Sequence, residues 1–302
     1  MIMRLLVIGA GGFIGAHVRG QAATAGLEVA TASRSALDGS PGHARADLAQ
    51  DSPAAIAALI DEVAPDVVVN CAGATTGDPA QLLAANVTSV YTLAKAMLSA
   101  RAPTRLVHLG SAAEYGPATP GVAVTEQSVP RPVAPYGATK LAGTQLIDLA
   151  CAAGLDALVL RVFNPVGPGA PAGSLPGRLA AELRRALRDG GGIHLGPTRA
   201  VRDFIDVRDV ADAIIAAAQV PKLPHRVLNI GTGHAVPAQV LVRQMLAISG
   251  WTGVIHEDSG GSPRTPDVSW QEADITCAVE DLGWKPSRDL TASLAALWET
   301  SQ

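Results

Sequence analysis

The chain has 302 residues, of which 48% are hydrophobic and 17% charged, so it can form one large core or a core with a smaller lobe attached. A net charge of -4 and an aromatic content of 3% argue against a nucleic-acid-binding surface, which needs basic patches and stacking rings. The 3 cysteines lack metal-binding or disulfide spacing and no apolar stretch reaches the roughly 18 residues of a membrane helix, so we expect a cytoplasmic protein without a metal site or a membrane span.

Short apolar runs alternate with helical patterns from residue 3 to about residue 165, as βαβ units around a parallel sheet require. Continuously apolar strands are expected where helices cover both faces of such a sheet. We therefore predict an α/β fold of the Rossmann type, with a doubly wound parallel sheet over residues 1–165. The predicted strands are Arg4–Ile8, Glu28–Ala32, Ala44–Asp47, Val67–Asn70, Leu106–Leu109 and Leu158–Arg161.

The pattern changes after the stretch FNPVGPGAPAGSLPG, which is rich in Pro and Gly and is typical of a long loop. Residues 166–302 are predicted to form mainly a smaller C-terminal α/β lobe that binds substrate. Two segments near residues 200–233, AVRDFIDVRDVADAI and RVLNIGTG, read as strand followed by helix, and we expect them to return to the first sheet. A chain that crosses back in this way leaves a cleft between two lobes.

A glycine cluster, VIGAGGFIGAHV, follows the first predicted strand. Gly9, Gly12 and Gly15 have the spacing G-x-x-G-x-x-G between a strand and a helix. In such a turn the first glycine permits the tight bend, the second lets the backbone approach a pyrophosphate, and the third lets the helix pack closely on the strand. The helix start at Phe13 and Ile14 adds free N–H donors. The cluster predicts a dinucleotide-binding turn, and the alternative is a tight turn with no ligand.

The second predicted strand is followed by Ser33 and Arg34, where a site for NAD usually has an acidic residue that binds the ribose. A guanidinium can bind the oxygens of a 2′-phosphate bidentately, and a serine hydroxyl can donate to them. We therefore predict NADPH rather than NAD, against the alternative of an exposed arginine with no role. Further contacts to the adenosine half of the cofactor are expected from Asp47, Leu48, Ala72 and Gly73.

The segment PYGATK places Tyr136 and Lys140 four residues apart, so that both project from one face of a helix. A phenol is a poor acid at neutral pH, but a fixed ammonium one turn away stabilises the phenolate and lowers the phenol pKa. Ser111, in HLGSAAEYG, lies just beyond a predicted strand, at the edge where doubly wound sheets bind ligands. A hydroxyl there can orient a carbonyl oxygen while Tyr136 protonates it. Alone, such a Tyr–Lys pair is more often a surface contact.

Together, these motifs resemble those of the extended short-chain dehydrogenase/reductases, the NAD-dependent epimerase/dehydratase family that acts on nucleotide-diphosphate sugars. The resemblance runs from about residue 4 to residue 298, through GAGGFIG, GSAAEYG, PYGATK, LRVFNPVGPG, RDFIDVRDVADA, NIGTG and LGWKP. It implies that Tyr136 donates a proton to the substrate. It also implies that Lys140 binds the nicotinamide ribose and that Ser111 positions the carbonyl.

The resemblance further implies a set of residues around the substrate's nucleotide diphosphate. Asn164, Arg202 and Arg264 match positions at which relatives hold this group, and Asn86 is expected to help organise the substrate site. Two arginines and an amide suit a diphosphate. For Arg202, an ion pair with Asp203 is the structural alternative.

Departures from the family pattern reduce the number of reactions that the chain is expected to catalyse. Sugar 4,6-dehydratases carry an Asp-Glu pair after the Ser/Thr, where this chain has Ala112 and Ala113, although Glu114 could still face the pocket. Ser33 and Arg34 disagree with the tightly held NAD of 4-epimerases. The motif GSAAEYG looks more like that of GDP-4-keto-6-deoxyhexose reductases. We therefore predict NADPH-dependent reduction of the C4 keto group of a nucleotide-diphospho-4-keto-6-deoxysugar.

Two other functions remain as alternatives. One is an NAD-dependent nucleotide-sugar 4-epimerase, and the other is a cofactor-sensing regulator that has the fold without the chemistry. The predicted partners are a nucleotide-diphospho-sugar substrate and a second copy of the chain, since a two-fold homodimer is the commonest oligomer. No nucleic acid or membrane partner is expected.

Overall fold

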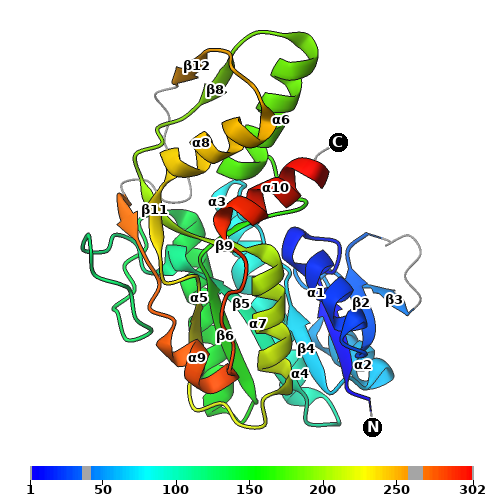
Figure 1. The fold of residues 1–302 in the computed structure, drawn as a ribbon. Helices are drawn as coiled ribbons and strands as arrows, with labels where there is room; N and C mark the ends of the chain where they lie inside the picture. Colours follow the sequence, from blue (N-terminus) through cyan, green and yellow to red (C-terminus); the bar gives the residue numbers. More distant parts are fainter. Residues whose placement is uncertain (1, 36–41, 258–267, 301–302) are drawn as a thin grey trace.

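The computed structural model describes residues 2–35, 42–257 and 268–300. A seven-stranded sheet in the order β10-β6-β5-β4-β1-β2-β3 forms its centre, and every neighbouring pair in it is parallel (Figure 1). This confirms the predicted α/β fold with a Rossmann-type sheet. The strands are β1 (Arg4–Ile8), β2 (Glu28–Ser33), β3 (His43–Arg45), β4 (Val67–Asn70), β5 (Arg105–Ser111), β6 (Ala157–Val162) and β10 (Val227–Ile230).

Helices cover both faces of this sheet. Leu5 and Leu6, successive residues of β1, are both fully buried and belong to hydrophobic clusters on opposite faces. This explains the continuously apolar strands, because neighbouring side chains of a strand point to opposite sides. One face is covered by α1 (Phe13–Thr24), α7 (Val207–Gln219) and α9 (Thr276–Leu282), and the other by α2 (Pro53–Val63), α4 (Ser89–Ser99) and α5 (Pro135–Ala152).

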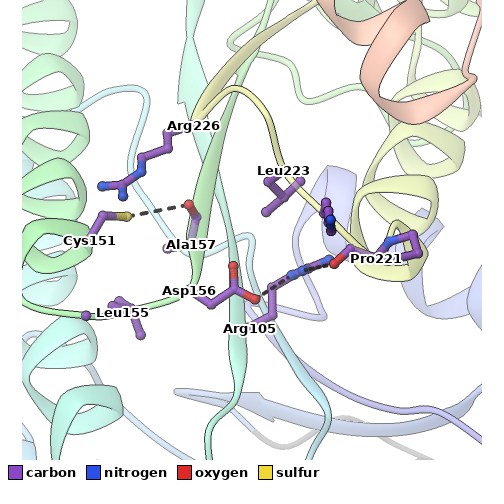
Figure 2. A pocket seen from close by; sticks show the side chains of 10 residues that line it. Arg105, Cys151, Leu155, Asp156, Ala157, Pro221, Leu223 and Arg226 are labelled. Carbon is purple, nitrogen blue, oxygen red and sulfur yellow. Dashed lines mark hydrogen bonds and ion pairs between the residues drawn. The ribbon is translucent and has the colours of Figure 1, made fainter.

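A cavity of about 560 Å³ opens at the edge of the sheet where the strands begin (Figure 2). Arg105, the first residue of β5, forms an ion pair there with Asp156, just before β6, at 2.9 Å. Ligands of parallel α/β sheets bind at the opposite edge, where the strands end. The fold therefore favours a functional site at that opposite edge, beyond Ile8, Asn70 and Ser111.

The C-terminal half builds a second, smaller sheet in the order β11-β9-β13, with β7 also paired to β9. Its elements enclose a separate hydrophobic cluster. The strands of this half are β7 (Asn164–Val166), β8 (Ile193–Leu195), β9 (Val201–Asp206), β11 (Ala235–Pro237), β12 (Ile255–Glu257) and β13 (Trp270–Gln271), where β8 pairs with β12. The helices packed on it are α6 (Leu175–Asp189), α8 (Ala238–Ser249) and α10 (Leu290–Thr300), and α3 (Pro79–Leu83) lies in the N-terminal half.

Of the two segments expected to return to the first sheet, one does so as a strand. β10 pairs with β6, but β9 pairs with β7, β11 and β13 and so lies in the smaller sheet. The expectation for β9 was wrong because its apolar pattern shows that it is a buried strand without showing which strand it pairs with. Only the helix after it, α7, returns, and it packs on the main sheet beside α1.

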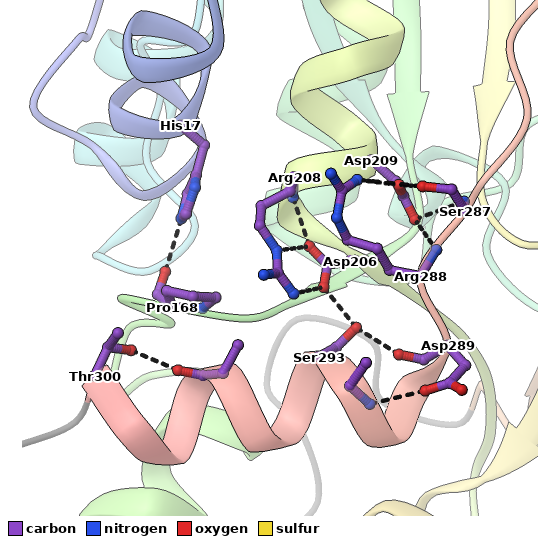
Figure 3. Close-up of polar contacts among 12 residues, drawn as sticks. His17, Pro168, Asp206, Arg208, Asp209, Ser287, Arg288, Asp289, Ser293 and Thr300 are labelled. Carbon is purple, nitrogen blue, oxygen red and sulfur yellow. Dashed lines mark hydrogen bonds and ion pairs between the residues drawn. The ribbon is translucent and has the colours of Figure 1, made fainter. Parts of the chain in front are cut away.

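Buried carboxylates join the smaller sheet to α7 and α10 (Figure 3). The Asp206 carboxylate, at the end of β9, accepts hydrogen bonds from Arg208 Nη2 and from Ser293 Oγ of α10, both at 2.7 Å. Burial alone would raise the pKa of Asp206, but these hydrogen bonds hold it below its usual value. Asp209 accepts from the Arg288 backbone N–H at 3.0 Å. No helix within the described ranges has the length and apolar character needed to cross a bilayer.

Candidate functional site

The glycine turn brings the ends of β1 and β4 together. Gly9 has a φ of +78°, and a Cβ on it would lie 2.7 Å from the backbone nitrogen of Ala72, which follows β4. A Cβ on Gly15 would overlap with the Gly9 carbonyl oxygen. Gly12 is the N-cap of α1 and provides no side-chain cap, so the first N–H groups of the helix face the turn without one. The geometry fits a dinucleotide pyrophosphate at the start of α1.

Basic side chains lie where β2 ends. Ser33 is the last residue of β2, and Arg34 follows it with an exposed side chain. Ser33 Oγ donates to the Ser35 carbonyl at 2.6 Å. Arg45, which the sequence analysis did not single out, is paired in register with Ser33 at the end of β3 and is also exposed. Two exposed arginines therefore lie near this strand end, and a guanidinium group can bind the oxygens of a phosphate bidentately.

The residues expected around the adenosine differ in how far they are exposed to a ligand. β3 ends at Arg45 rather than at Asp47, and the Asp47 carboxylate accepts from the Ala49 backbone N–H at 3.0 Å, within a turn. Leu48 is only 4% exposed and packs in the core, so little of its surface is open to a ligand. Gly73 is exposed beside the glycine turn. A Cβ on Gly73 would lie 3.0 Å from Asn86 Oδ1 and 3.9 Å from Lys140 Nζ, so the absence of a side chain lets this backbone lie close to both residues.

The structure brings Ser111 and the helix with Tyr136 and Lys140 to the same edge of the sheet. Ser111 is the last residue of β5, and Lys140, buried on α5, donates from Nζ to the Leu109 carbonyl oxygen of β5. Tyr136 is half-buried in the first turn of α5. The next residue, Gly137, lies against Ala113 so closely that a Cβ on it would overlap with the Ala113 carbonyl. The start of α5 thus rests directly on the residues after Ser111.

Burial governs the charge of Lys140. It lowers the pKa of this ammonium, while the negative charge of Glu114 and the thiol of Cys71 act in the opposite direction. Burial likewise raises the pKa of Cys71 to about 12, so that this thiol stays protonated at neutral pH. Cys71 therefore contributes no negative charge to the site under these conditions.

Asn86 lies in a π-helical turn, Ala84–Thr88, and connects two parts of the site. Its Oδ1 accepts from the Ala74 N–H at 3.0 Å, and its Nδ2 donates to the Ala74 carbonyl at 2.9 Å and to Thr139 Oγ1 at 3.1 Å. Because Asn86 is 2% exposed and both amide hydrogens are used, it has no free donor for a substrate. It fixes the backbone after β4 against α5.

The expected diphosphate residues lie along the smaller sheet. Asn164 Nδ2 donates to the Asp203 backbone carbonyl at 3.0 Å, and Arg202 Nη2 donates to the Val268 carbonyl at 2.6 Å. Burial lowers the pKa of Arg202. The Asp203 carboxylate accepts from Thr232 Oγ1 at 2.6 Å, on the other side of β9 from Arg202, as neighbours in a strand must be. The remaining residue of this set, at position 264, lies outside the described residues.

Glu114 does not face the pocket. It is fully buried, and its Oε2 lies 2.8 Å from Arg161 Nε in an ion pair with β6. The residue is part of a 3-10 turn, Ala112–Glu114, directly after Ser111. The sequence contains a sign of this role, since Ser followed three residues later by Glu is the pattern of a capping box.

Comparison with known proteins agrees with this geometry. Residues 5–231 match the model of the NAD dependent epimerase/dehydratase family. The chain is 38% identical over 301 residues to the dTDP-6-deoxy-L-talose 4-dehydrogenase (NAD(P)(+)) of Kitasatospora kifunensis, covering 98% of this chain and 94% of that protein. It is 31% identical over 226 residues to the UDP-glucose 4-epimerase of Streptomyces lividans, covering 71% and 67% of the two. The structure of MoeE5 in complex with UDP-glucuronic acid and NAD has a TM-score of 0.86 and 30% identity, over 99% of this chain and 98% of that one.

Proposed function

Because the chain belongs to the NAD dependent epimerase/dehydratase family, we propose that it uses NADPH to reduce the C4 keto group of a nucleotide-diphospho-4-keto-6-deoxysugar. Its family makes the chain an NAD(P)-dependent oxidoreductase of the extended short-chain dehydrogenase/reductase type. The relatives compared above are named as enzymes, which supports catalysis over a cofactor-sensing role.

The position of Lys140 carries the proposal. This buried ammonium, one helical turn after Tyr136, donates to β5 at Leu109 and lies beside the Gly73 backbone, next to the glycine turn. A cofactor whose pyrophosphate lies at the start of α1 would extend its nicotinamide toward this edge of the sheet. The arrangement supports the assignment of Lys140 to the nicotinamide ribose.

Three side chains bind and protonate the substrate carbonyl in the proposed reaction. The Ser111 Oγ accepts from the Ala113 N–H at 3.2 Å, so its own proton remains available for the C4 oxygen. The Tyr136 phenol gives its proton to that oxygen, and the Lys140 ammonium stabilises the phenolate that remains. When bound, NADPH would supply the hydride for the new C4–H bond and would be released as NADP⁺. The hydride electron pair forms the C4–H bond, the π electrons of the carbonyl form the O–H bond with the proton from Tyr136, and the C4–O single bond remains.

Two features support a reductase of a nucleotide-linked 6-deoxysugar over a dehydratase. The relative from Kitasatospora kifunensis is named for dehydrogenation at C4 of a dTDP-linked 6-deoxysugar, which is the same hydride transfer in the opposite direction. Ala112 and Ala113 provide no carboxylate for the removal of water, and Glu114 is fully buried behind them. We assign the diphosphate of the substrate to Asn164, Arg202 and Arg264.

The test is turnover with a defined substrate panel. The purified protein is mixed with NADPH and with dTDP-, GDP-, UDP- or CDP-linked 4-keto-6-deoxysugars, and the loss of reduced nicotinamide absorbance is followed. We expect consumption with at least one of these ketones and none with the matching 4-hydroxy sugar. Identification of a C4 alcohol as product completes the assignment, and consumption with no member of the panel overturns it.

A 4-epimerase is the second candidate. The similarity to a UDP-glucose 4-epimerase over 71% of the chain favours it. An epimerase oxidises and re-reduces the same sugar, so it retains its cofactor through the cycle. Purified protein that carries bound NAD and interconverts C4 epimers without added reductant would establish this function instead.

We also propose a homodimer. Tyr91 and Leu98 lie seven residues apart on the same face of α4 and are 53% and 42% exposed, and Leu149 of the neighbouring α5 is 67% exposed. Burial of such a face against a second copy would remove apolar surface from water. Light scattering measures the mass directly, and a monomer at micromolar concentration would contradict this proposal.

A further inference from the structure

A buried ion pair lies directly behind the proposed reacting groups. Glu114 is 0% exposed and Arg161 is 4% exposed, and their closest atoms are 2.8 Å apart. Burial of two charges is costly, and a well-packed apolar pair often stabilises a core equally well. What the two charges contribute therefore lies in the specific contacts that they make.

One oxygen of Glu114 holds the backbone of Ser111. Glu114 Oε1 accepts from the Ser111 N–H at 2.8 Å, while Ser111 Oγ accepts from the Ala113 N–H at 3.2 Å. The two bonds form a capping box that fixes the 3-10 turn Ala112–Glu114 and with it the χ1 angle of Ser111. Glu114 thus holds the backbone from which the Ser111 side chain extends.

The other oxygen of Glu114 holds the helix that carries Tyr136 and Lys140. Glu114 Oε2 accepts from Thr144 Oγ1 at 2.9 Å, and Thr144 lies on α5 one turn after Lys140. The same oxygen accepts from Arg161 Nε on β6. A single carboxylate therefore contacts β5, β6 and α5 at once.

The packing around the carboxylate leaves no room for a shift. A Cβ on Gly110 would lie 2.7 Å from Glu114 Oε1. On the far side, the Arg161 guanidinium lies 4.6 Å from the centre of the Tyr115 ring, and the Tyr115 hydroxyl donates to Asn229 Oδ1 of β10 at 2.7 Å. The pair therefore lies among β5, β6 and β10, which are neighbours in the main sheet.

The charged and titratable groups around Lys140 come from several elements. Cys71 follows β4, His108 lies on β5, Glu114 lies in the 3-10 turn, and Arg161 lies behind Glu114 on β6. Burial keeps the pKa of His108 well below its usual value, so this imidazole is neutral at pH 7. The ion pair of Glu114 with Arg161 lies behind Lys140, and the negative charge of Glu114 favours the ammonium form of Lys140.

From these contacts we propose that Glu114 is a positioning residue, which sets the Ser111 hydroxyl relative to the helix of Tyr136 and Lys140 and keeps an anion behind the ammonium. The expected effect of Glu114 on turnover rests on the proposed function, because it is measured with the ketone substrate. The expected effect on cofactor binding does not, because it is measured with NADPH alone.

The experiment compares Glu114→Gln, Thr144→Val and Thr144→Ser with a matched control, Ser293→Ala. The control removes another buried hydrogen bond to a carboxylate, that of Asp206, between α10 and β9, which carry none of the proposed reacting groups. For each protein we measure kcat and KM with the ketone substrate, the dissociation constant of NADPH against pH without sugar, and the melting temperature.

We expect Thr144→Val to lower kcat about tenfold with KM within about twofold, and Thr144→Ser to restore it, because one hydrogen bond in the positioning network is lost and regained. Glu114→Gln should lower kcat further and move the alkaline limits of turnover and of NADPH affinity to lower pH, because Lys140 then loses its proton more easily. Ser293→Ala should change the melting temperature alone.

The proposal is overturned if Thr144→Val keeps the wild-type kcat, or if Glu114→Gln folds and shows unchanged pH limits. If Glu114→Gln fails to fold, the comparison of Thr144→Val with Thr144→Ser tests the proposal instead. Absence of turnover in the wild type would refute the proposed function, and the pH dependence of NADPH affinity in the Glu114 and Thr144 variants would then decide the role of Glu114 by itself.

Discussion

Gly137 lies in contact with the Ala113 carbonyl, with no room for a Cβ between them. The contact joins the first turn of α5, next to Tyr136, to the turn that follows Ser111. The spacing between the proposed proton donor and the proposed carbonyl-orienting hydroxyl is therefore fixed by backbone contact, independently of any bound ligand.

Gly137→Ala should push these two segments apart. We expect kcat to fall at least about tenfold, because a displacement on the ångström scale disturbs the alignment of reacting groups, while NADPH binding at the glycine turn changes little. Steady-state kinetics and a cofactor titration check this. Gly20→Ala, in α1 at an open position with nothing within 4 Å of a Cβ and without a positive φ, is a control for steric effects. Unchanged kcat in Gly137→Ala would show that the contact does not set the geometry.

Tyr136→Phe should bind NADPH as the wild type does and turn over at least about a hundredfold more slowly, the usual scale for a lost general acid. The ring remains and only the hydroxyl is removed, so the fold should be unaffected. Single-turnover measurement of hydride transfer isolates this step. Wild-type turnover in this variant would exclude Tyr136 as the proton donor.

Arg34→Asp should reverse the preference between NADPH and NADH, because a carboxylate repels a 2′-phosphate and accepts from a ribose hydroxyl. The ratio of kcat/KM for the two cofactors is the measurement. Arg101→Asp makes the same charge change at a side chain that is 90% exposed and lies before β5 begins, so it should leave the ratio unchanged. Equal ratios in the Arg34 variant and the wild type would remove Arg34 from the site.

Ser293→Ala should lower the free energy of unfolding by about 1 kcal/mol at pH 7, the usual value of one buried hydrogen bond. The pKa of Asp206 is held below its unfolded value, so its contribution is present above about pH 4 and is lost as the pH falls through the folded pKa. The difference between wild type and variant should therefore be constant from pH 7 to about pH 4.5 and shrink below. Urea unfolding measures it, and a difference that changes near pH 6 would point to a histidine instead.

The local structure of the main sheet and its glycine turn could be predicted from the sequence. The apolar run of β1 ends at Ile8, one residue before Gly9, so strand and turn are encoded by neighbouring residues. The four-residue spacing of Tyr136 and Lys140 likewise needs only the helix period. These features depend on contacts between residues close together in the chain.

Contacts between residues far apart in the chain could not be predicted from the sequence in the same way. β9 has the composition of a buried strand, and nothing in it indicates that its partners are β7, β11 and β13. From the sequence, Asn86 is expected to help organise the substrate site, and Glu114 could still face the pocket. Their actual partners, Thr139 and Arg161, lie 53 and 47 residues away in the chain.

The return of β10 to the main sheet means that neither half of the chain is a separable folding unit. A fragment ending near residue 165 would lack the strand that covers β6, leaving an unpaired apolar edge open to other chains. It would also lack Asn229, the partner of the Tyr115 hydroxyl. Excision of the nucleotide-binding half should thus yield an aggregating polypeptide, and any chimera of this enzyme must exchange residues 227–230 together with the first 165.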